Sequence, residues 1–457
     1  LNFCKIESHV VKWTFGASWK SPEKVFTIWK GNSVPIVKPP QIVQNAVDEF
    51  LAPLFQNQPQ RKHLANYLTG LMIAQNKTVA GMTSEMPNAS DQSCLNRFMT
   101  EVEWDVNAVN KARIEWLQQF DDTRFHERGV IGLDDVLIDK TGKFIKDSGT
   151  FWDHSEQRYK HAQDLILINY MNPISGKRYP LEFRRFKKEN QCEWTGEEFK
   201  KMTTLSIELI NWCHENGVLG TFTFDSFYTC HEIQNHINSL ENADGTSRGY
   251  VGDLKFNRKV VFKGVEQQAV EFAKTIPPKD RKKVTTSDGT KQWYLSVCVK
   301  MPNVDHKVRI VILWKSKNDA EPRKIVATNR IFWNAERIVQ TYRGRWGSTE
   351  TIHRDGKQEL GLGDCQLRDD QGQTRHTYMV FLAYSLLMRE LDKTSVSGWA
   401  SVKLATIGES CRALLRDSIR SMIDWIFEQL DIDPHTHRGT GRRLGSIMQR
   451  LGLTVGK

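Results

Sequence analysis

The spacing of apolar residues predicts helices in the first part of the chain. From about residue 41 to residue 128, apolar side chains recur at intervals of three and four, as in Leu64, Leu68 and Leu71. Asp91 stands just before the next apolar group, and an Asp in this place is typical of a helix start. The stretch therefore predicts a small helical bundle.

Four short apolar stretches then predict strands, with one helix before the last of them. The strands are expected at residues 129–133, 164–170, 179–186 and 219–224, and the helix at 197–215. The first strand leads directly into Asp134 and Asp135, and the fourth is followed by Asp225. Because open α/β sheets place their sites at the carboxyl ends of strands, these acids are candidate site residues.

The pattern changes again between residues 247 and 332. Apolar and polar positions alternate at 259–263, 293–299 and 308–314, separated by turn-rich stretches such as 287–290. This alternation predicts a mostly β insertion, after which a helix resumes near Asn334. The expected parts are an N-terminal helical region (1–128), a first core segment (129–246), the β-rich insertion (247–332), a second core segment (333–395) and a C-terminal helical region with a basic tail (396–457).

Composition narrows the class of partner. The 457 residues include 64 Lys and Arg against 54 Asp and Glu, a net charge of +10 that suits a nucleic-acid partner. The eight cysteines form no C-x-x-C pair, so neither a zinc finger nor a disulfide framework is indicated, and a reducing cytoplasm is expected. The longest apolar run, Met379–Met388, is too short for a membrane span and predicts a buried core helix.

One charged stretch is not explained by packing alone. Glu350, Arg354 and Lys357 are spaced by four and three residues, which places them within roughly 60° of one another on a helix. The stretch has few apolar residues, chiefly Ile352 and Leu360. It is either a solvated helix with charge pairs or part of a functional site.

Together with two preceding residues, this stretch resembles a known motif. Tyr342, Arg345, Glu350 and Lys357 are similar to the Tyr/Arg/Glu/Lys motif of DDE transposases from bacterial insertion sequences, whose usual spacing is Tyr-x2-Arg-x3-Glu-x6-Lys. Here four residues separate Arg345 from Glu350. Thr349 occupies the strict position, but it cannot bind a metal as a carboxylate does, so Glu350 is the expected acid. The resemblance covers roughly residues 45 to 390.

The resemblance also assigns the first two acids. The family usually reads Asp-x-Thr or Asp-Asp-Thr at the first, and matching this pattern to Asp134-Asp135-Val136 favours Asp134, with Asp135 as the alternative. Adjacent strand residues face opposite ways, so only one of the two is expected to reach the site. The segment around Asp225, residues 223–228, resembles the family's second strand-to-Asp segment.

This family implies an α/β RNase H-like catalytic core, here with a mostly β insertion and flanked by helical N- and C-terminal regions. Asp134, Asp225 and Glu350 would then be the catalytic carboxylates and the metal ligands. Clustered carboxylates repel one another unless cations lie among them, and oxygen-only ligands favour two Mg²⁺ ions, which Mn²⁺ can replace. Such a pair activates a water or a 3′-hydroxyl and stabilises the leaving oxygen.

The resemblance further implies residues that bind DNA. Tyr342 and Arg345 would hold phosphates near the cleaved end, and Lys357 would position the backbone. Arg354 would do the same or would pair with Glu350 in the metal-free site.

Three further features leave two readings open. The N-terminal helices either read DNA ends or serve only in packing, and the basic tail at 435–457 either grips phosphates or is a frayed terminus. Residues 255–283 of the insertion carry nine basic residues against three acids. Trp293, Trp314 and Trp333 in and next to the insertion are either core residues or surfaces for an extruded base, and the resemblance implies cleavage through a DNA hairpin.

The expected function is therefore that of a DNA transposase. It would bind the terminal inverted repeats of its own element, cleave DNA with two metal ions and join the 3′ ends to target DNA, acting as a homodimer on double-stranded DNA. The expected location is the bacterial cytoplasm in association with the nucleoid. The alternatives are a structure-specific nuclease on the same core and a domesticated or inactive relative that only binds DNA.

Overall fold

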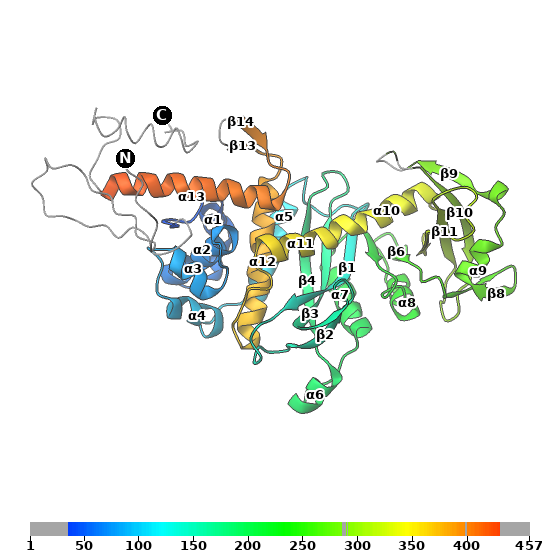
Figure 1. Ribbon diagram of the computed structural model, residues 1–457, viewed down its shortest axis with the longest axis horizontal. Helices are drawn as coiled ribbons and strands as arrows, with labels where there is room; N and C mark the ends of the chain where they lie inside the picture. Colours follow the sequence, from blue (N-terminus) through cyan, green and yellow to red (C-terminus); the bar gives the residue numbers. More distant parts are fainter. Residues whose placement is uncertain (1–34, 286–288, 290, 398–399, 430–457) are drawn as a thin grey trace, which may run out of the picture.

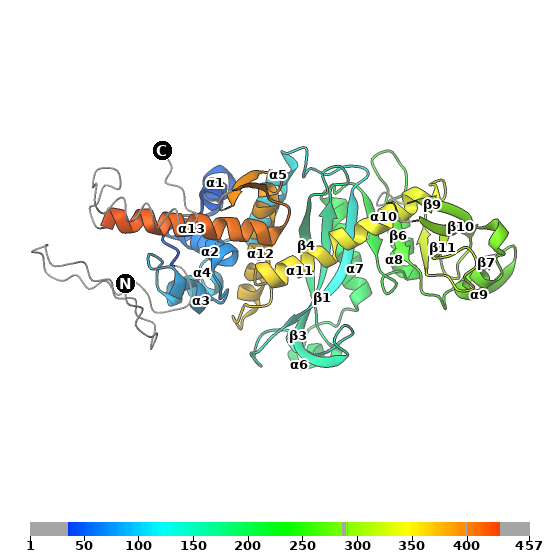
Figure 2. The same cartoon turned by 45° about the horizontal axis from the view of Figure 1, so that its top comes forward.

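The computed structural model describes residues 35–285, 289, 291–397 and 400–429. The chain is elongated, with helices at one end, a sheet in the middle and a β-rich lobe at the other end (Figures 1 and 2). It is a mixed α/β protein with one large mixed sheet, which confirms that part of the predicted fold class. The predicted basic tail, at residues 435–457, lies outside the described residues, as does most of the predicted turn at 287–290.

The N-terminal end is built from short helices whose first turns are capped by polar side chains. Asn57, Thr78, Asp91 and Asp105 each accept a hydrogen bond from a backbone N–H of the first turn that follows, which satisfies a donor the helix leaves unpaired. The helices are α1 (Gln41–Ala46), a π-helix (Val47–Leu51), a 3₁₀ turn (Ala52–Leu54), α2 (Gln58–Ile73), α3 (Val79–Glu85), α4 (Gln92–Thr100) and α5 (Val106–Gln118).

The central sheet has ten strands in the order β2-β3-β1-β5-β6-β12-β11-β10-β9, with β4 paired to β3. In its middle, β1 runs antiparallel to β3 and parallel to β5, and β5 runs parallel to β6. The first six strands are β1 (Val130–Asp139), β2 (Gly149–Asp153), β3 (Arg158–Met171), β4 (Arg178–Phe186), β5 (Thr221–Phe224) and β6 (Gly249–Asp253), with α6 (Glu189–Thr195), α7 (Met202–Glu215) and α8 (His231–Ser239) between them.

The prediction that the first strand ends at Leu133 is wrong. β1 continues through both acids to Asp139, because β3 pairs with all ten of its residues. β5 pairs only with residues 130–133 of β1. Asp134 and Asp135 therefore lie inside a strand, at the point where its pairing with β5 stops.

Most strands of the segment expected to be a mostly β insertion extend this same sheet. Its strands are β6, β9 (Lys282–Thr285), β10 (Lys291–Val299), β11 (Val308–Trp314) and β12 (Lys324–Thr328), with the hairpin of β7 (Lys259–Phe262) and β8 (Val265–Gln268), α9 (Ala269–Lys274) and a 3₁₀ turn (Pro278–Asp280). One face of this part buries an apolar cluster under α9 and β7, and the other face packs against the first turns of α10 (Ala335–Ser348).

Two helices cross the molecule from the β-rich lobe to the helical end. α10 and α11 (Glu350–Glu359) run end to end over the sheet (Figure 1) and meet at Thr349, whose backbone angles of −124° and −80° are not helical. α12 (Asp370–Glu390) lies between the sheet and the N-terminal helices and is buried along most of its length, as predicted for the apolar run at 379–388. β13 (Thr394–Ser397), β14 (Ala400–Lys403) and α13 (Ile407–Gln429) follow.

The three described apolar clusters show where the core lies. The largest joins the N-terminal helices, the centre of the sheet and α12 into one continuous core. Within the described residues, no helix is both long and apolar enough to cross a membrane.

Candidate active site

The first predicted acid, Asp134, lies on the face of the sheet that α10 and α11 cover. Gly132, two residues earlier and on the same face, lies so close to the helix junction that an added Cβ would stand 2.4 Å from Ser348 Oγ. Only a glycine permits this approach. The junction therefore passes directly over the strand, and the Arg345 guanidinium reaches Asp134 with Nη1 3.1 Å from Oδ2.

One guanidinium links the first and third predicted acids. Arg345 Nη1 lies 3.1 Å from Asp134 Oδ2 and 3.8 Å from Glu350 Oε1. The Arg345 and Asp134 side chains are only 12% and 14% exposed, whereas Glu350 is 42% exposed. A cation thus already lies between two of the carboxylates, and it is supplied by the protein.

The junction between α10 and α11 accounts for the extra residue in the motif. Thr349 is fully buried, and its Oγ1 donates to the backbone carbonyl of Arg345 at 2.9 Å. Since Thr349 leaves the helical conformation, α11 begins anew at Glu350 and turns this carboxylate toward Arg345. The four-residue gap is compatible with Glu350, and not Thr349, facing Asp134.

The second predicted acid, Asp225, follows the end of β5 at the same level of the sheet. Phe224 pairs with Leu133, so Asp225 is the strand neighbour of Asp134, and its charge acts on both Asp134 and Asp135. Its Oδ1 accepts from the backbone N–H groups of Phe227 and Tyr228 at 2.8 and 3.3 Å. This turn fixes the direction of the carboxylate.

The alternative first acid, Asp135, faces the other side of the sheet. The hydroxyl of the buried Tyr228 donates to Asp135 Oδ1 at 2.7 Å. Asp164 of β3 lies close enough to feel its charge, and burial together with that charge raises the pKa of Asp164 to about 8. Asp134, and not Asp135, shares a cation with Glu350.

Burial disfavours the ionised form of Asp134 and Asp135 when no added cation is bound. It raises the pKa of Asp134 well above its usual range, the charge of Asp135 adds to the rise, and Arg345 opposes it. Burial also raises the pKa of Asp135, although the hydrogen bond from Tyr228 opposes that rise. Ionising the whole group requires positive charge beyond that of one arginine.

The donor chemistry fits a hard divalent cation, but the present arrangement is not that of a formed metal centre. Asp134, Asp225 and Glu350 offer only oxygen ligands, as Mg²⁺ and Mn²⁺ prefer. Among the residues that the structure describes, however, no three His, Cys, Asp or Glu side chains are grouped so that they could hold a metal ion. A metal ion between Asp134 and Glu350 would have to displace the guanidinium of Arg345.

Tyr342 is placed beside a lysine that the sequence patterns did not single out. Its hydroxyl accepts from Lys324 Nζ at 3.0 Å, and Lys324 also pairs with Asp253 at 2.9 Å. Lys324 begins β12 and Asp253 ends β6, so only the strand pairing brings them to Tyr342. No spacing along the chain could have revealed this group.

The other two predicted DNA-binding residues lie on α11. Arg354 is 56% exposed and pairs with its neighbour Asp355 at 3.1 Å. The alternative expectation that it pairs with Glu350 is wrong, because Arg345 takes that place. Lys357 is exposed and lies toward the end of β1, where Asp139 is one of the charges that act on it.

The three tryptophans of the β-rich part differ in their surroundings. Trp314 is fully buried with Arg281 stacked on it at 4.1 Å, so it is a core residue and not a surface for a base. Trp293 packs against the same core, with Lys317 at 5.2 Å from its ring. Trp333 is partly exposed and is covered by Arg337 at 3.8 Å.

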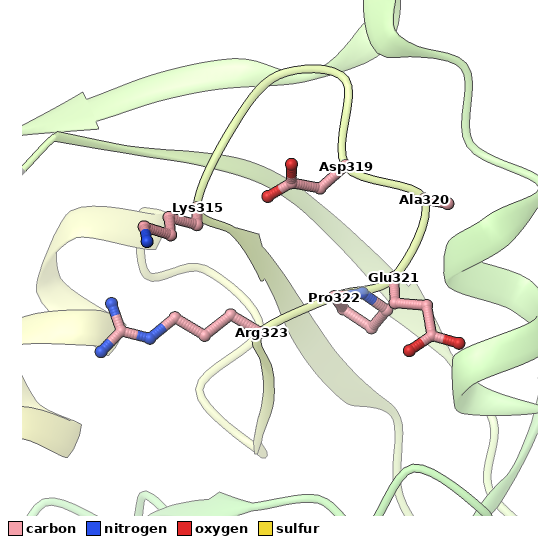
Figure 3. A pocket seen from close by; sticks show the side chains of 6 residues that line it. All are labelled: Lys315, Asp319, Ala320, Glu321, Pro322 and Arg323. Carbon is pink, nitrogen blue, oxygen red and sulfur yellow. The ribbon is translucent and has the colours of Figure 1, made fainter.

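A hollow in the β-rich part lies in the turn between β11 and β12. Figure 3 shows Lys315 and Arg323 pointing to one side of this turn, with the Asp319 carboxylate across from them. The turn is held by Arg281, which donates to the backbone carbonyls of Lys317 and Asp319. Because the hollow is open and contains no member of the carboxylate group, it is not the candidate active site.

One comparison with known proteins supports a nuclease of this type. Residues 50–242, less than half of the chain, match the family model described as DDE superfamily endonuclease. The match includes Asp134 and Asp225 and ends before Glu350. It supports a DDE-type nuclease or transposase.

One solved structure and the curated proteins add little to this family match. The crystal structure of human ENDOV resembles 55% of this chain and 98% of that chain, with 11% identity and a TM-score of 0.25. A likeness this weak does not bear on the assignment. No curated protein matches the chain.

Proposed function

We propose that this chain is a DDE transposase with an RNase H-like core, which cleaves DNA at the ends of a mobile element and joins the 3′ ends to target DNA. The observation that carries the proposal is the contact of Asp134 and Glu350 with one arginine, beside Asp225. These acids come from three separate segments of the chain. The motif resemblance assigns the catalytic role to these three acids and phosphate binding to Arg345.

The three carboxylates would hold two Mg²⁺ ions, or Mn²⁺ in their place. When bound, such ions supply an activated water or 3′-hydroxyl and stabilise the departing oxygen of a phosphodiester. The hydrogen bonds from the backbone of residues 227 and 228 would keep Asp225 aimed at the same place throughout. The glycine at 132 keeps the helix junction, and with it Glu350, close to the strand.

Arg345 would have two uses at different stages. In the free protein it neutralises Asp134 and Glu350, which lowers the cost of holding them near each other. Its planar group also suits a phosphate, to which it can give two parallel hydrogen bonds once DNA is present. Lys324 and Tyr342 lie beside it and would bind the same backbone.

The DNA would lie along the edge of the sheet where β5 and β6 end. β12 begins at this edge with Lys324, so the preceding turn brings Lys315 and Arg323 to the same side of the sheet. The net charge of +10 favours binding to DNA through its phosphates, whatever the base sequence of the DNA. A homodimer on double-stranded DNA is part of the proposal, because two element ends must be cut and joined together, and association with the bacterial nucleoid would follow.

A structure-specific nuclease is the second candidate, because the family match is worded as an endonuclease. Strand joining separates the two. Purified protein would be incubated with Mg²⁺, a supercoiled target plasmid and a labelled DNA fragment. The 3′ ends of this fragment carry the sequences that flank the gene of this protein. A transposase transfers the label to the plasmid, whereas a nuclease releases fragments and transfers none. Binding without either product would indicate an inactive DNA-binding relative.

A further inference from the structure

Two loops at the active-site edge of the sheet carry exposed aromatic rings. One loop follows β5 and includes Phe227, and the other follows β6 and includes Lys255 and Phe256. Phe227 and Phe256 are 44% and 40% exposed as whole residues. Phe227 is only two residues from Asp225, so this surface adjoins the candidate carboxylates. We call Phe227, Lys255 and Phe256 the aromatic ledge.

Contacts with Tyr228 and Asp225 fix the position of the Phe227 ring. It meets the ring of Tyr228 edge to face, with centroids 5.0 Å apart and planes at 87°. Tyr228 is fully buried, and its hydroxyl holds Asp135 at 2.7 Å. The backbone N–H of Phe227 also donates to Asp225 Oδ1 at 2.8 Å. The ring therefore has a defined position relative to the second acid.

The two loops are tied to each other. Arg258 Nη2 donates to the backbone carbonyl of Thr229 at 3.0 Å, and Thr229 Oγ1 donates to the carbonyl of Asp225 at 2.8 Å. Lys255 places its ammonium group 5.8 Å from the centre of the Phe227 ring. A cation thus lies over an exposed aromatic face, next to an acid of the candidate site.

Single exposed apolar residues are common on protein surfaces and need no function. Phe227 differs because its ring, the ammonium group of Lys255 and the carboxylate of Asp225 occur together. An unpaired nucleotide has a flat base and a phosphate, and proteins bind it by stacking the base on an aromatic ring while a basic residue contacts the backbone.

We propose that Phe227 is a stacking platform for an unpaired base next to the phosphate that is cut, and that Lys255 contacts a backbone phosphate of the same strand. The proposal rests on the proposed function, because the strand must lie at the carboxylates. When the base covers the ring, the flexible stem of Lys255 lets its ammonium group move out to the phosphate. Phe227 is thus a substrate-positioning residue.

The test is binding of a single-stranded oligonucleotide that contains 2-aminopurine, whose fluorescence falls when it stacks. The full chain is used in the Glu350→Gln background so that the DNA stays intact. We expect Phe227→Leu to weaken single-strand binding by about tenfold and to abolish the quenching, because one stacked base is lost. Phe227→Trp should retain both. Binding to a fully paired duplex should change by less than about twofold, since paired bases do not stack on the ring.

Phe332→Leu is the matched control. Phe332 is 94% exposed, but it follows β12, which runs antiparallel to β6, so it lies at the opposite edge of the sheet. The proposal is overturned if Phe227→Leu binds and quenches as the parent does, or if Phe332→Leu weakens binding equally. Lys255→Ala should lower the dependence of log K on log salt by about one, and an unchanged slope would remove Lys255 from the proposal.

These outcomes are separable from the fate of the proposed function. If the platform variant loses single-strand binding while Glu350→Gln cuts DNA like the wild type, the ledge is a nucleic-acid site but the carboxylate assignment fails. If Glu350→Gln abolishes cutting while Phe227→Leu changes nothing, only the platform is wrong. Thermal unfolding of each variant verifies that the loops still fold.

Discussion

Asp134 and Asp135 are neighbours in one strand, yet the protein treats them differently. Asp134 faces the helix junction and meets a guanidinium that also contacts Glu350. Asp135 faces the other side of the sheet and meets a neutral tyrosine hydroxyl, with the buried Asp164 nearby. Asp134 is paired with a cation that a metal ion can displace, whereas Asp135 accepts a hydrogen bond from a neutral hydroxyl, which orients it without compensating a negative charge. On this basis we propose a role in the chemistry for Asp134 and a role in structural support for Asp135.

The largest expected difference is in cleavage by the two asparagine variants. We expect Asp134→Asn to lower the rate of DNA cleavage by a factor on the order of 10³ or more, because a charged ligand beside the reacting phosphate is lost. Asp135→Asn should keep most of the rate. Single-turnover cleavage with Mg²⁺ measures both. Equal losses in the two variants would contradict the distinction between the faces.

Arg345 contacts both Asp134 and Glu350, so its removal should affect both DNA cleavage and metal binding. We expect Arg345→Ala to lower cleavage by about 10- to 100-fold, because phosphate contacts are lost, and at the same time to strengthen Mn²⁺ binding to the DNA-free protein, because a competing cation is gone. Isothermal titration with Mn²⁺ gives the affinity. Arg345→Lys, which keeps the charge, should lie between the variant and the wild type. Weaker metal binding in Arg345→Ala would show that the arginine orients ligands and does not compete with the metal.

On the other face, Tyr228→Phe should affect stability more than chemistry. Removing the hydroxyl leaves the half-buried Asp135 short of a donor, which costs about 1–3 kcal/mol of unfolding free energy. Urea denaturation measures the loss, and Tyr159→Phe, at an exposed tyrosine, is the control. A cleavage rate that falls as far as in Asp134→Asn would place Tyr228 and Asp135 in the chemistry after all.

A change confined to the pH dependence of stability is expected for Asp164, with no change in cleavage. Burial and the charge of Asp135 raise its pKa to about 8, above its value in the unfolded chain. The folded protein therefore binds this proton more tightly than the unfolded chain, so the contribution is fully present below about pH 4 and is lost as pH rises through about 8. Asp164→Asn should flatten the fall in stability over this range, as measured by urea denaturation at several pH values. An unchanged dependence of unfolding free energy on pH in Asp164→Asn would contradict the raised pKa of Asp164.

Local features of the fold could be predicted from the sequence, whereas the pairing between distant segments could not. The helix start at Asp91 and the strand at 179–186 depend on side chains near in sequence, and the structure has both. The length of β1 follows from its pairing with β3, and the apolar residues 136–138 after the two acids were the local sign that the strand continues. Because it depends on pairing between distant segments, the extension of the central sheet by the β-rich part was not predicted.

The same limit applies to the candidate site. The three acids could be named because two come directly after short apolar stretches and one lies in a motif. Which of Asp134 and Asp135 faces Glu350 depends on strand register and on the close approach at Gly132. Lys324 had no signal in any spacing, because it reaches the site from another strand, whereas Phe227 lies in the segment around Asp225 and only its exposure in the folded chain sets it apart.

The central claim is that Asp134, Asp225 and Glu350 form one metal-dependent centre for DNA cleavage. The most direct measurement is cleavage of the DNA flanking this protein's own gene, with Mg²⁺ or Mn²⁺, on a denaturing gel that also resolves hairpins. Wild type is compared with Glu350→Gln and with Glu336→Gln, a matched change on the exposed first turn of α10. We predict metal-dependent cuts at a pair of inverted repeats, lost only in Glu350→Gln. Cuts that persist in Glu350→Gln, or specific binding without cuts in the wild type, would contradict the account.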